Sequence, residues 1–291
     1  MGCEELGLRL VHSISETRDS VAQIRSRGLK IGFVPTMGAL HEGHMSLVCR
    51  ARAECGFVAV SIFVNPTQFG PNEDYDRYPR TLGEDTEKCR AAGVDLVFAP
   101  SAAEMYPEGF DSWVEVKGTL TETLEGASRP GHFRGVTTVC AKLFGIVQPD
   151  YAYFGMKDYQ QLLVIRKMVR DLNLPLGIVP CETVREPDGL AMSSRNAYLS
   201  PEERRAALVL SKSLEQAQAG FNSGERRAQA IREAAENLIA SEPLAAIDYV
   251  AVRDADSLEP VEFIDRPAVL LLAVRIGSTR LIDNTVLSRP L

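Results

Sequence analysis

The stretch Ile31-Gly-Phe-Val-Pro-Thr-Met-Gly-Ala-Leu-His-Glu-Gly-His-Met-Ser-Leu47 predicts a strand, a glycine turn and the start of a helix. Its first residues are apolar, Pro35 is expected to end the strand, and Gly38 allows a sharp turn. His41 and His44 are three residues apart, so they share one face if a helix begins there. A helix N-terminus carries unpaired N–H groups and a partial positive charge, and these favour phosphate.

Two histidines three residues apart can also bind a metal or be incidental surface residues. The chain has only four histidines, however, and two of them fall in this one turn. No third ligand lies near them in sequence, so the pair favours phosphate over zinc. Imidazole N–H groups suit a phosphate oxygen or the bridging oxygen of a leaving group.

Length and composition predict a globular protein with one large or two ordinary domains, since the chain has 291 residues and is 45% hydrophobic. The net charge of −7 argues against general nucleic-acid binding, which needs a basic surface. Six scattered cysteines without a C-x-x-C pair, and no signal peptide, predict reduced, mostly buried thiols and a cytoplasmic location. The longest apolar run, residues 268–274, is too short to span a bilayer.

Strand-like and helix-like segments alternate over the first two thirds of the chain. Short apolar runs predict strands, and apolar residues at a spacing of three or four predict helices. This alternation indicates an α/β fold, with a Rossmann-like parallel sheet and helices on both faces. Ligands in such folds bind beyond the carboxyl ends of strands, and polar motifs follow Val34, Val64 and Phe154 there. The strands are expected near 57–64, 94–99, 151–154 and 178–179, and the helices near 17–27, 45–55, 82–92, 136–147 and 162–172.

The pattern changes near residue 184. Ser200-Pro-Glu-Glu203 is a capping box with proline at the first helical position, so a helix is expected to begin there. A second helix near 226–239 and strand-like runs near 247–253, 269–275 and Leu281 follow. We therefore expect two domains, residues 1–184 and a smaller α+β domain over residues 185–291.

A second polar motif, Gly155-Met-Lys157-Asp158, lies between a predicted strand and a predicted helix. Lys157 is suited to act as a point charge on phosphates. Asp158 is suited to cap the helix, to bond a ribose hydroxyl or to help hold Mg²⁺. The alternative is an ordinary turn with a surface lysine.

Three further groups of residues have a functional and a structural interpretation. Met192-Ser-Ser-Arg195 offers two hydroxyls and a guanidinium, as a mobile phosphate clamp would, or it is a solvated linker. Gln68 and Gln161 carry amides that both donate and accept, which suits a substrate with hydroxyl and carboxylate groups, although glutamine is usually a surface residue. His132 and Arg134 could face phosphate or a substrate carboxylate, or lie in a surface loop.

These motifs also carry a family resemblance. His41-Glu-Gly-His44 resembles the HxGH signature of the nucleotidyltransferase superfamily, and the longer string from Pro35 to His44 is similar to the pantothenate synthetases. Residues 192–195 resemble the KMSKS-type loop of that superfamily. Similarity extends through Asn65-Pro-Thr-Gln-Phe69, Pro130-Gly-His-Phe-Arg-Gly135, Asp248-Tyr-Val250 and Arg275-Ile-Gly-Ser-Thr-Arg-Leu-Ile-Asp-Asn284. Met156 and Thr67 depart from the family's usual Gln and Leu.

The resemblance implies an ATP-dependent ligase of coenzyme A (vitamin B5) biosynthesis. Pantoate and β-alanine would be joined through a pantoyl adenylate, with AMP and pyrophosphate released and Mg²⁺ required. It implies a homodimer that acts on small molecules, while the net charge and the short apolar runs argue against a nucleic-acid or membrane partner. The alternatives are a nucleotidyltransferase that releases a stable adenylylated product, or a non-catalytic nucleotide-binding module.

The resemblance also implies roles for individual residues. The domain of residues 1–184 would bind ATP and pantoate, and residues 185–291 would form a lid over the site. The implied catalytic residues are His44, His41 and Lys157. The implied ATP contacts are Met37, Gly38, Ala39, Leu40, His41, Glu42, Gly43, His44, Gly155, Met156, Lys157, Asp158, Val184, Met192, Ser193, Ser194 and Arg195. The implied substrate contacts are Gln68, Gln161, His132 and Arg134, and Asp158 is the implied metal ligand.

Overall fold

The computed structural model describes residues 7–71 and 73–288 and divides the chain into two compact units. The first unit consists of Met1–Met156 and Val164–Glu182, and the second of Lys157–Leu163 and Thr183–Leu291. The division lies close to the expected domain boundary, but it also assigns the short segment from Lys157 to the second unit. The lid role of the C-terminal domain stays a prediction.

The first unit contains a six-stranded sheet in the order β1-β4-β3-β2-β5-β6, with parallel pairing throughout. From β2 the chain adds β3 and β4 on one side and β5 and β6 on the other. The order therefore reverses between β2 and β5, and ligands of open parallel sheets bind at such a point. The strands are β1 (Arg9–Val11), β2 (Ile31–Thr36), β3 (Phe57–Ile62), β4 (Leu96–Phe98), β5 (Tyr151–Gly155) and β6 (Gly177–Cys181).

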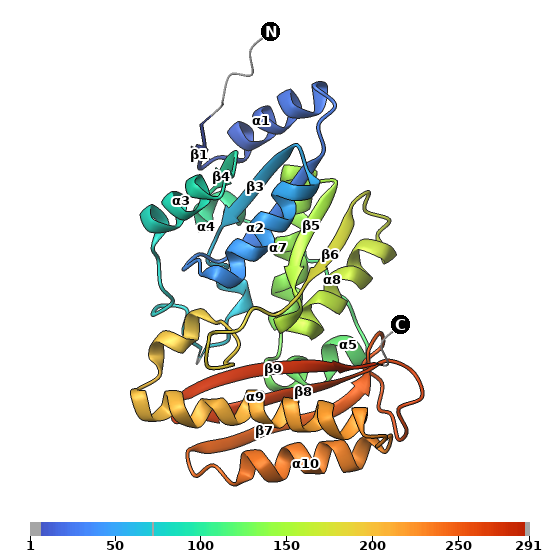
Figure 1. The fold of residues 1–291 in the computed structure, drawn as a ribbon. Helices are drawn as coiled ribbons and strands as arrows, with labels where there is room; N and C mark the ends of the chain where they lie inside the picture. The colour runs from blue at the N-terminus through green and yellow to red at the C-terminus, as the bar shows by residue number, and fades with distance from the viewer. Residues whose placement is uncertain (1–6, 72, 289–291) are drawn as a thin grey trace. The chain divides into compact units, whose positions relative to one another are not determined.

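Helices cover both faces of this sheet, which confirms the predicted α/β class. Helix α2 lies on the face turned to the viewer in Figure 1, and α7 lies behind the sheet. The central strands are consequently apolar on both sides, and Ile31, Phe33 and Val34 are fully buried. The longer helices are α1 (Ile14–Ser26), α2 (Glu42–Glu54), α3 (Leu82–Ala91), α7 (His132–Val147) and α8 (Tyr159–Asp171). The short ones are η1 (Pro66–Gln68), α4 (Ala102–Met105), α5 (Thr119–Glu122), α6 (Glu125–Ser128) and η2 (Met156–Asp158).

Three sequence-based expectations need correction. Pro35 does not end its strand, because β5 pairs only with Gly32 and Phe33 and no ladder N–H is required of the proline. Strand β6 is an edge strand with half-buried Ile178 and Val179, although a core strand was expected. Strand β1, three residues long and mostly exposed, was not predicted at all.

The second unit is an antiparallel sheet in the order β7-β8-β9, against which helices α9 and α10 pack (Figure 1). This confirms the smaller α+β part of the predicted fold. Helix α9 begins with the expected capping box: Ser200 Oγ accepts from the Glu203 N–H at 3.2 Å, and Glu203 Oε2 accepts from the Ser200 N–H at 2.8 Å. The elements are η3 (Ser194–Tyr198), α9 (Pro201–Asn222), α10 (Ala228–Ala240), β7 (Ala245–Asp254), β8 (Ala268–Ile276) and β9 (Thr279–Leu287).

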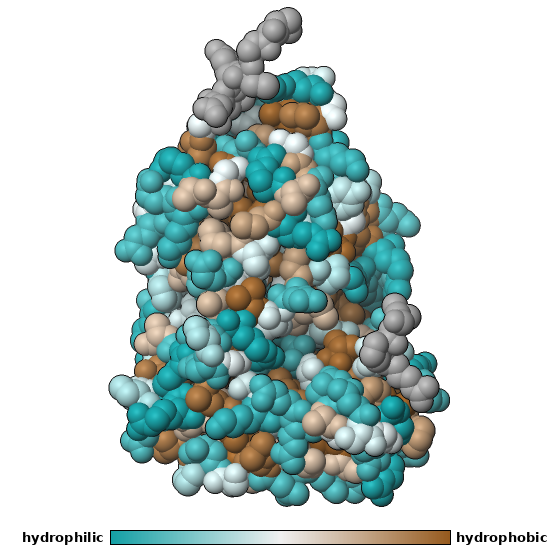
Figure 2. Space-filling view, viewed as in Figure 1, coloured by the Kyte–Doolittle hydropathy of each residue, from teal (hydrophilic) through white to brown (hydrophobic). Residues whose placement is uncertain are grey.

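The distribution of apolar residues on the surface and the state of the cysteines agree with the expectations from composition. On the face shown in Figure 2, apolar residues form small areas between polar and charged ones. Within residues 7–71 and 73–288, no helix combines the length and apolarity needed to cross a membrane. The described cysteines are free thiols, four of them buried and Cys49 exposed, while Cys3 lies outside the described residues.

Candidate active site

The turn after β2 has a backbone that requires glycine at one position. Gly38 has φ +88°, and the next residue, Ala39, has φ +50°. A Cβ atom at Gly38 would lie 3.2 Å from Asp85 Oδ2 and 3.2 Å from Ile62 Cγ2. A side chain at this position would therefore be strained by both its backbone conformation and its neighbours.

A buried carboxylate on α3 fixes this turn. Asp85 Oδ2 accepts from the Ala39 N–H at 2.9 Å, and Asp85 Oδ1 accepts from the Leu40 N–H at 2.8 Å. Lys88, one turn further along α3, donates to the Leu40 carbonyl at 2.7 Å. Sequence reasoning missed Asp85, because its distance of 45 residues from Leu40 leaves no local signal.

The two histidines occupy the cap of α2. His41 is the N-cap residue, and its Nδ1 accepts from the Gly43 N–H at 3.1 Å. His44 is the third helical residue, and its Nδ1 accepts from the His41 N–H at 3.3 Å. The pair thus forms a capping box out of two imidazoles, a motif usually built from Ser or Thr and Glu or Gln. Their ring centroids are 4.1 Å apart.

This cap changes the predicted phosphate chemistry. The N–H groups of Gly43 and His44 are already bonded, to His41 Nδ1 and to the His41 carbonyl, so they are not the unpaired donors that were expected. Because each ring accepts at Nδ1, a neutral imidazole carries its proton on Nε2 in this arrangement. The donors suited to a phosphate are therefore the two Nε2–H groups.

Gln68 is held from two directions after β3. Its Oε1 accepts from Asn65 Nδ2 at 2.9 Å, and Asn65 itself is 1% exposed. The other Asn65 amide atom, Oδ1, accepts from the Tyr106 hydroxyl at 2.8 Å, which fixes the orientation of the Asn65 amide. Within the described residues the Gln68 Nε2 group donates to no protein atom, so this amide presents two N–H donors.

His132 supports the same glutamine through its main chain. His132 Nδ1 lies 2.8 Å from the Gln68 carbonyl and its Nε2 lies 3.0 Å from Arg129 Nη1. Arg129 in turn forms an ion pair with Glu73 at 2.6 Å. Burial, reinforced by the Arg129 charge, lowers the pKa of His132 to about 4, so the ring is neutral. Both ring nitrogens are engaged, which argues against the expected direct contact of His132 with a substrate.

Arg134 follows His132 in the first turn of α7. Its guanidinium is 4.7 Å from the centroid of the Trp113 ring, and the side chain is exposed. The next residue, Gly135, allows α7 to approach η1 closely, since a Cβ there would lie 2.2 Å from the Thr67 carbonyl oxygen. The sequence motif around Arg134 thus includes one residue for packing and one that stacks on an aromatic ring.

In the second unit, η2 presents two charged side chains. The Lys157 carbonyl accepts from Asn284 Nδ2 at 2.9 Å, which anchors the turn to β9. Neither the Lys157 ammonium nor the Asp158 carboxylate bonds another described residue. Gln160 is 2% exposed, whereas Gln161 is half-buried, so Gln161 is the more accessible of the two amides.

The segment of residues 184–195 is a hairpin rather than a loose linker. The Val184 carbonyl accepts from the Met192 N–H at 3.0 Å, and Ser193 Oγ accepts from the Arg195 N–H at 3.3 Å. Beyond it, Asn196 Nδ2 donates to Glu186 Oε1 at 2.7 Å. A hydrogen bond from Arg204, on α9, is the main influence that lowers the pKa of Glu186.

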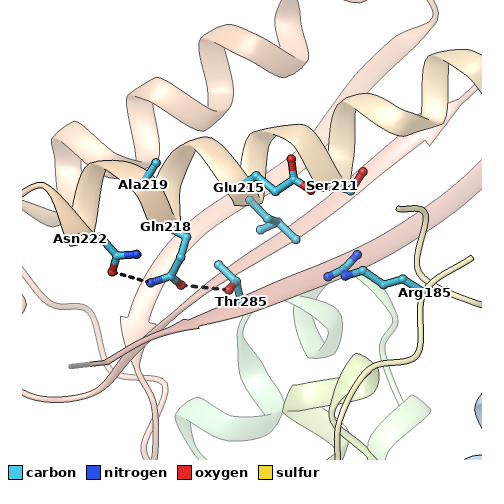
Figure 3. A pocket seen from close by; sticks show the side chains of 8 residues that line it. Arg185, Ser211, Glu215, Gln218, Ala219, Asn222 and Thr285 are labelled. Atoms are coloured by element: carbon cyan, nitrogen blue, oxygen red, sulfur yellow. Dashed lines mark hydrogen bonds between the residues drawn. The ribbon is translucent and has the colours of Figure 1, made fainter. Parts of the chain in front are cut away.

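A cavity of about 360 Å³ lies between α9 and β9 (Figure 3). Arg185 borders it and is fixed by Asp283, whose buried carboxylate accepts from Nη1 at 2.6 Å and Nη2 at 3.0 Å. None of the predicted site residues lines this cavity. The lining residues are Arg185, Ser211, Leu214, Glu215, Gln218, Ala219, Asn222 and Thr285.

The described part of the chain holds no group of three or more His, Cys, Asp or Glu residues that could bind a metal ion through protein ligands alone. Burial raises the pKa of the Cys89 and Cys140 thiols to about 12, so neither forms a thiolate at neutral pH.

A family model described as pantoate-beta-alanine ligase matches residues 9–286. The chain belongs to this family. It is 58% identical over 278 residues to a pantothenate synthetase of Pelotomaculum thermopropionicum, covering 96% of this chain and 98% of the relative. It is 59% identical to a pantothenate synthetase of Moorella thermoacetica, covering 96% and 99%.

Two solved structures extend the comparison. A pantothenate synthetase of Thermus thermophilus superposes with a TM-score of 0.91 at 50% identity, covering 95% of this chain and 98% of the other. The pantoate-beta-alanine ligase of Francisella tularensis, complexed with beta-gamma ATP and beta-alanine, has a TM-score of 0.79 at 36% identity, covering 97% and 99%. The chain is accordingly an enzyme, a ligase that joins pantoate to β-alanine. The comparisons do not favour the alternative of a nucleotidyltransferase with a stable adenylylated product.

Proposed function

We propose that this chain activates pantoate with ATP and then transfers the pantoyl group to β-alanine. In the first step a pantoate carboxylate oxygen bonds to the α-phosphorus, the bond from that phosphorus to the bridging oxygen breaks, and pyrophosphate leaves. In the second step the β-alanine nitrogen bonds to the acyl carbon, the acyl carbon–oxygen bond breaks, and AMP leaves. The amine gives up a proton in this step, and the product is pantothenate.

The arrangement of His41 and His44 carries this proposal. Negative charge moves onto the pyrophosphate oxygens as the bond to the α-phosphorus breaks. Two Nε2–H donors, set by the cap of α2 at the carboxyl end of β2, are suited to stabilise that charge. Donors already held in place need no reorganisation when the charge develops. The remaining residues of the turn, Met37 to Gly43, would contact ATP mainly through the main chain.

On the substrate side, the proposed contacts are Gln68, Gln161 and Arg134. The Gln68 amide is oriented by Asn65 so that its two N–H donors can bind the hydroxyl or carboxylate oxygens of pantoate. His132 would act as a positioning residue, because its ring holds the Gln68 carbonyl and has no free nitrogen for a ligand. The binding of β-alanine by the Francisella tularensis relative supports a second substrate site in this family.

Residues of the second unit, together with Gly155 and Met156 of the first, are proposed to bind ATP. Lys157 would place its ammonium on the phosphates, and Ser193, Ser194 and Arg195 would clamp them when the C-terminal domain acts as a lid. Val184 would bond adenine through its main chain, and Gly155, Met156 and Met192 would line the nucleotide. Asp158 is a single carboxylate, which fits Mg²⁺ held mostly by substrate phosphates and water. Mg²⁺ would supply charge neutralisation at the phosphates.

The second step requires a neutral amine. A primary amine is mostly protonated at pH 7, so the site must lower the pKa of the β-alanine ammonium or accept its proton. Burial of the amine between polar groups that do not carry positive charge would favour the neutral form.

We also propose that the enzyme works as a homodimer in the cytoplasm and binds neither nucleic acid nor membranes. The support for the last two points is the net charge of −7 and the small, dispersed apolar areas in Figure 2. Its partners would be the small molecules ATP, pantoate and β-alanine.

Isotope exchange tests the order of the chemistry. The enzyme with Mg²⁺, ATP and pantoate alone should exchange labelled pyrophosphate into ATP, because adenylation is complete before the amine reacts. Adding β-alanine should yield AMP and pantothenate in equal amounts. Exchange that requires β-alanine would contradict a separate adenylation step. Release of ADP and phosphate would instead indicate an acyl phosphate intermediate.

A further inference from the structure

The hairpin of residues 184–195 is tied to helix α9 by a group of four side chains, which we call the Arg204 network. All four residues lie in the second unit, between Thr183 and Leu291. They border residues 193–195, which we call the phosphate clamp, but none of them is proposed to contact ATP or a substrate. The members of the network are Glu186, Asp188, Asn196 and Arg204.

Arg204 anchors the network to a rigid element. It is the fourth residue of α9, a helix of 22 residues that begins with the capping box at Ser200. Its Nη2 donates to Glu186 Oε2 at 2.6 Å and to Asp188 Oδ2 at 2.7 Å, and its Nε donates to Asp188 Oδ2 at 3.0 Å. A planar guanidinium that bonds two carboxylates at once fixes their positions as well as their charges. The turn of the hairpin is therefore held against α9.

Glu186 extends this constraint towards the phosphate clamp. One of its oxygens accepts from Arg204, and the other, Oε1, accepts from Asn196 Nδ2 at 2.7 Å. The same Nδ2 group donates to the Ala191 carbonyl at 3.0 Å. Asn196 comes directly after the clamp, and its N–H donates to the Ser193 carbonyl at 3.0 Å. A continuous chain of hydrogen bonds thus leads from α9 to both ends of residues 191–195.

The orientation of the Asn196 amide is unfavourable for one of its own atoms. Its Oδ1 is buried and accepts no hydrogen bond within residues 7–71 and 73–288. A buried acceptor without a donor is destabilising, and such groups are rare in proteins. Turning the amide over would not help, because Oδ1 would then face two acceptors, Glu186 Oε1 and the Ala191 carbonyl. The amide therefore holds this segment of the chain at the expense of stability, which indicates a functional constraint.

The neighbouring arginine has different surroundings. Arg205 is exposed, and its side chain forms no hydrogen bond or ion pair with another described residue. Arg204 and Arg205 carry the same charge at almost the same place on α9, but only Arg204 reaches the hairpin. The contrast separates the contacts of the network from the positive charge of the helix.

We propose that Arg204 is a positioning residue for adenylation, acting through Glu186 and Asn196 to hold the phosphate clamp in the arrangement that meets ATP. This inference rests on the proposed function, in which residues 193–195 bind the phosphates. A loop that is already held at its base loses less conformational freedom when it closes on a ligand, so the ligand binds more tightly. The network supplies this hold without touching ATP.

Arg204→Gln removes the anchor. It should lower kcat/KM for ATP about tenfold, mainly by raising the KM for ATP, because charge-assisted hydrogen bonds that position the clamp are lost. The KM values for pantoate and β-alanine should stay near those of the wild type, since neither substrate is proposed to contact the clamp. Arg204→Lys keeps the charge and should recover part of the loss. Initial rates of pyrophosphate release, with each substrate varied in turn, provide these constants.

Two further variants serve as control and as independent test. Arg205→Gln makes the same charge change at the neighbouring residue and should leave every KM within about twofold of the wild type. Asn196→Ala breaks the chain of hydrogen bonds nearer the clamp and keeps the ion pairs of Arg204, so it should also raise the KM for ATP. If the two residues act along one route, the double variant N196A/R204Q should be no worse than the stronger single variant.

Arg195→Ala separates this inference from the proposed function. If that variant binds and uses ATP like the wild type, the clamp itself is wrong. If it loses activity with ATP but Arg204→Gln and Asn196→Ala, folded by circular dichroism, keep the KM for ATP of the wild type, only this inference is overturned. A lower kcat with every KM unchanged would assign Arg204 to stability alone, and additive effects of R204Q and N196A would overturn the route through Asn196.

Discussion

The histidine turn at the start of α2 and the lysine turn η2 illustrate two ways of presenting charged or polar groups to a ligand. In the histidine turn, His41 and His44 each use one ring nitrogen to hold the local main chain. In η2, Asn284 fixes the main chain of Lys157, but the Lys157 ammonium bonds no described residue. The first turn orients its side chains before a ligand binds, whereas the second orients only its backbone.

The difference has an energetic consequence. An imidazole that is already held loses little freedom when a phosphate binds, so its hydrogen bond acts fully in the transition state. A lysine side chain carries about 2 kcal/mol of rotamer entropy, which it loses when it binds. We therefore expect the histidines to contribute to both stability and turnover, and Lys157 to contribute to ligand binding and chemistry alone.

His44→Ala should produce the largest effect. Loss of one preorganised donor should lower kcat by about 10²–10³, and loss of the cap should lower the stability of the protein by about 1 kcal/mol. Steady-state kinetics and urea unfolding measure the two effects. Near-normal turnover would remove His44 from the mechanism.

His44→Gln is the matched variant. Glutamine at the third helical position can accept from the N-cap N–H, as in an ordinary capping box, so it should recover most of the lost stability. It lacks the imidazole Nε2–H, so turnover should stay low. Recovery of turnover together with stability would show that His44 acts only through the cap.

Lys157→Ala should lower the rate of adenylation strongly, by roughly 10² if its ammonium stabilises the phosphates like other lost charge-assisted contacts. Its melting temperature should match that of the wild type, since the ammonium bonds no described residue and Asn284 bonds the Lys157 main chain. Single-turnover pyrophosphate release and thermal denaturation provide the two measurements. Full adenylation by the folded variant would contradict the assignment, and a lowered melting temperature would contradict the contrast between the two turns.

The smallest effect is expected for His132, on the free energy of unfolding, and only at acidic pH. Its pKa is about 4 in the folded protein against 6.5 in the unfolded chain, so the unfolded chain binds the proton first. The neutral ring contributes stability above pH 6.5, and this contribution is lost as the pH falls from 6.5 towards 4. The full difference corresponds to roughly 3 kcal/mol, of which only part is lost by about pH 5.

The variant His132→Asn keeps a donor for the Gln68 carbonyl but cannot titrate. Its free energy of unfolding, measured with urea at several pH values between about 5 and 7, should depend less on pH than that of the wild type. Equal slopes for the two proteins would show that His132 is not the group responsible.

The sequence predicts the elements whose signals are local. Buried strands such as β3 appear as continuous apolar runs, and the α9 capping box is complete within four residues. The sequence does not predict β1, because this strand is short and mostly exposed. It also does not predict that β6 lies at an edge, because strand order depends on segments far apart in the chain. The strand was expected to end at Pro35, but it continues to Thr36. Pro35 is tolerated because β5 does not pair with β2 at this position, so no N–H is required there.

The candidate site shows the same limit. The HxGH turn, η2 and the hairpin of residues 184–195 are visible as motifs, and the family resemblance connects them. Asp85, which holds the turn after β2, gives no signal in the sequence because its partners lie far along the chain. Arg129, which contacts the His132 ring, belongs to no motif that would distinguish it from other arginines. The sequence did not reveal that the N–H groups of Gly43 and His44, expected to be unpaired, are bonded to His41.

Helix α7 mechanically joins two features that are distant in sequence. His132 in its first turn holds Gln68, while Thr137 and Thr138 in its second turn hold Val114, in the irregular segment of residues 112–117. The two attachment points are separated by roughly 9 Å of helix, at a rise of about 1.5 Å per residue. The close approach at Gly135 leaves no room for the helix to slide past η1. Any displacement of residues 112–117 is therefore expected to be transmitted along α7 to the amide that we propose for pantoate.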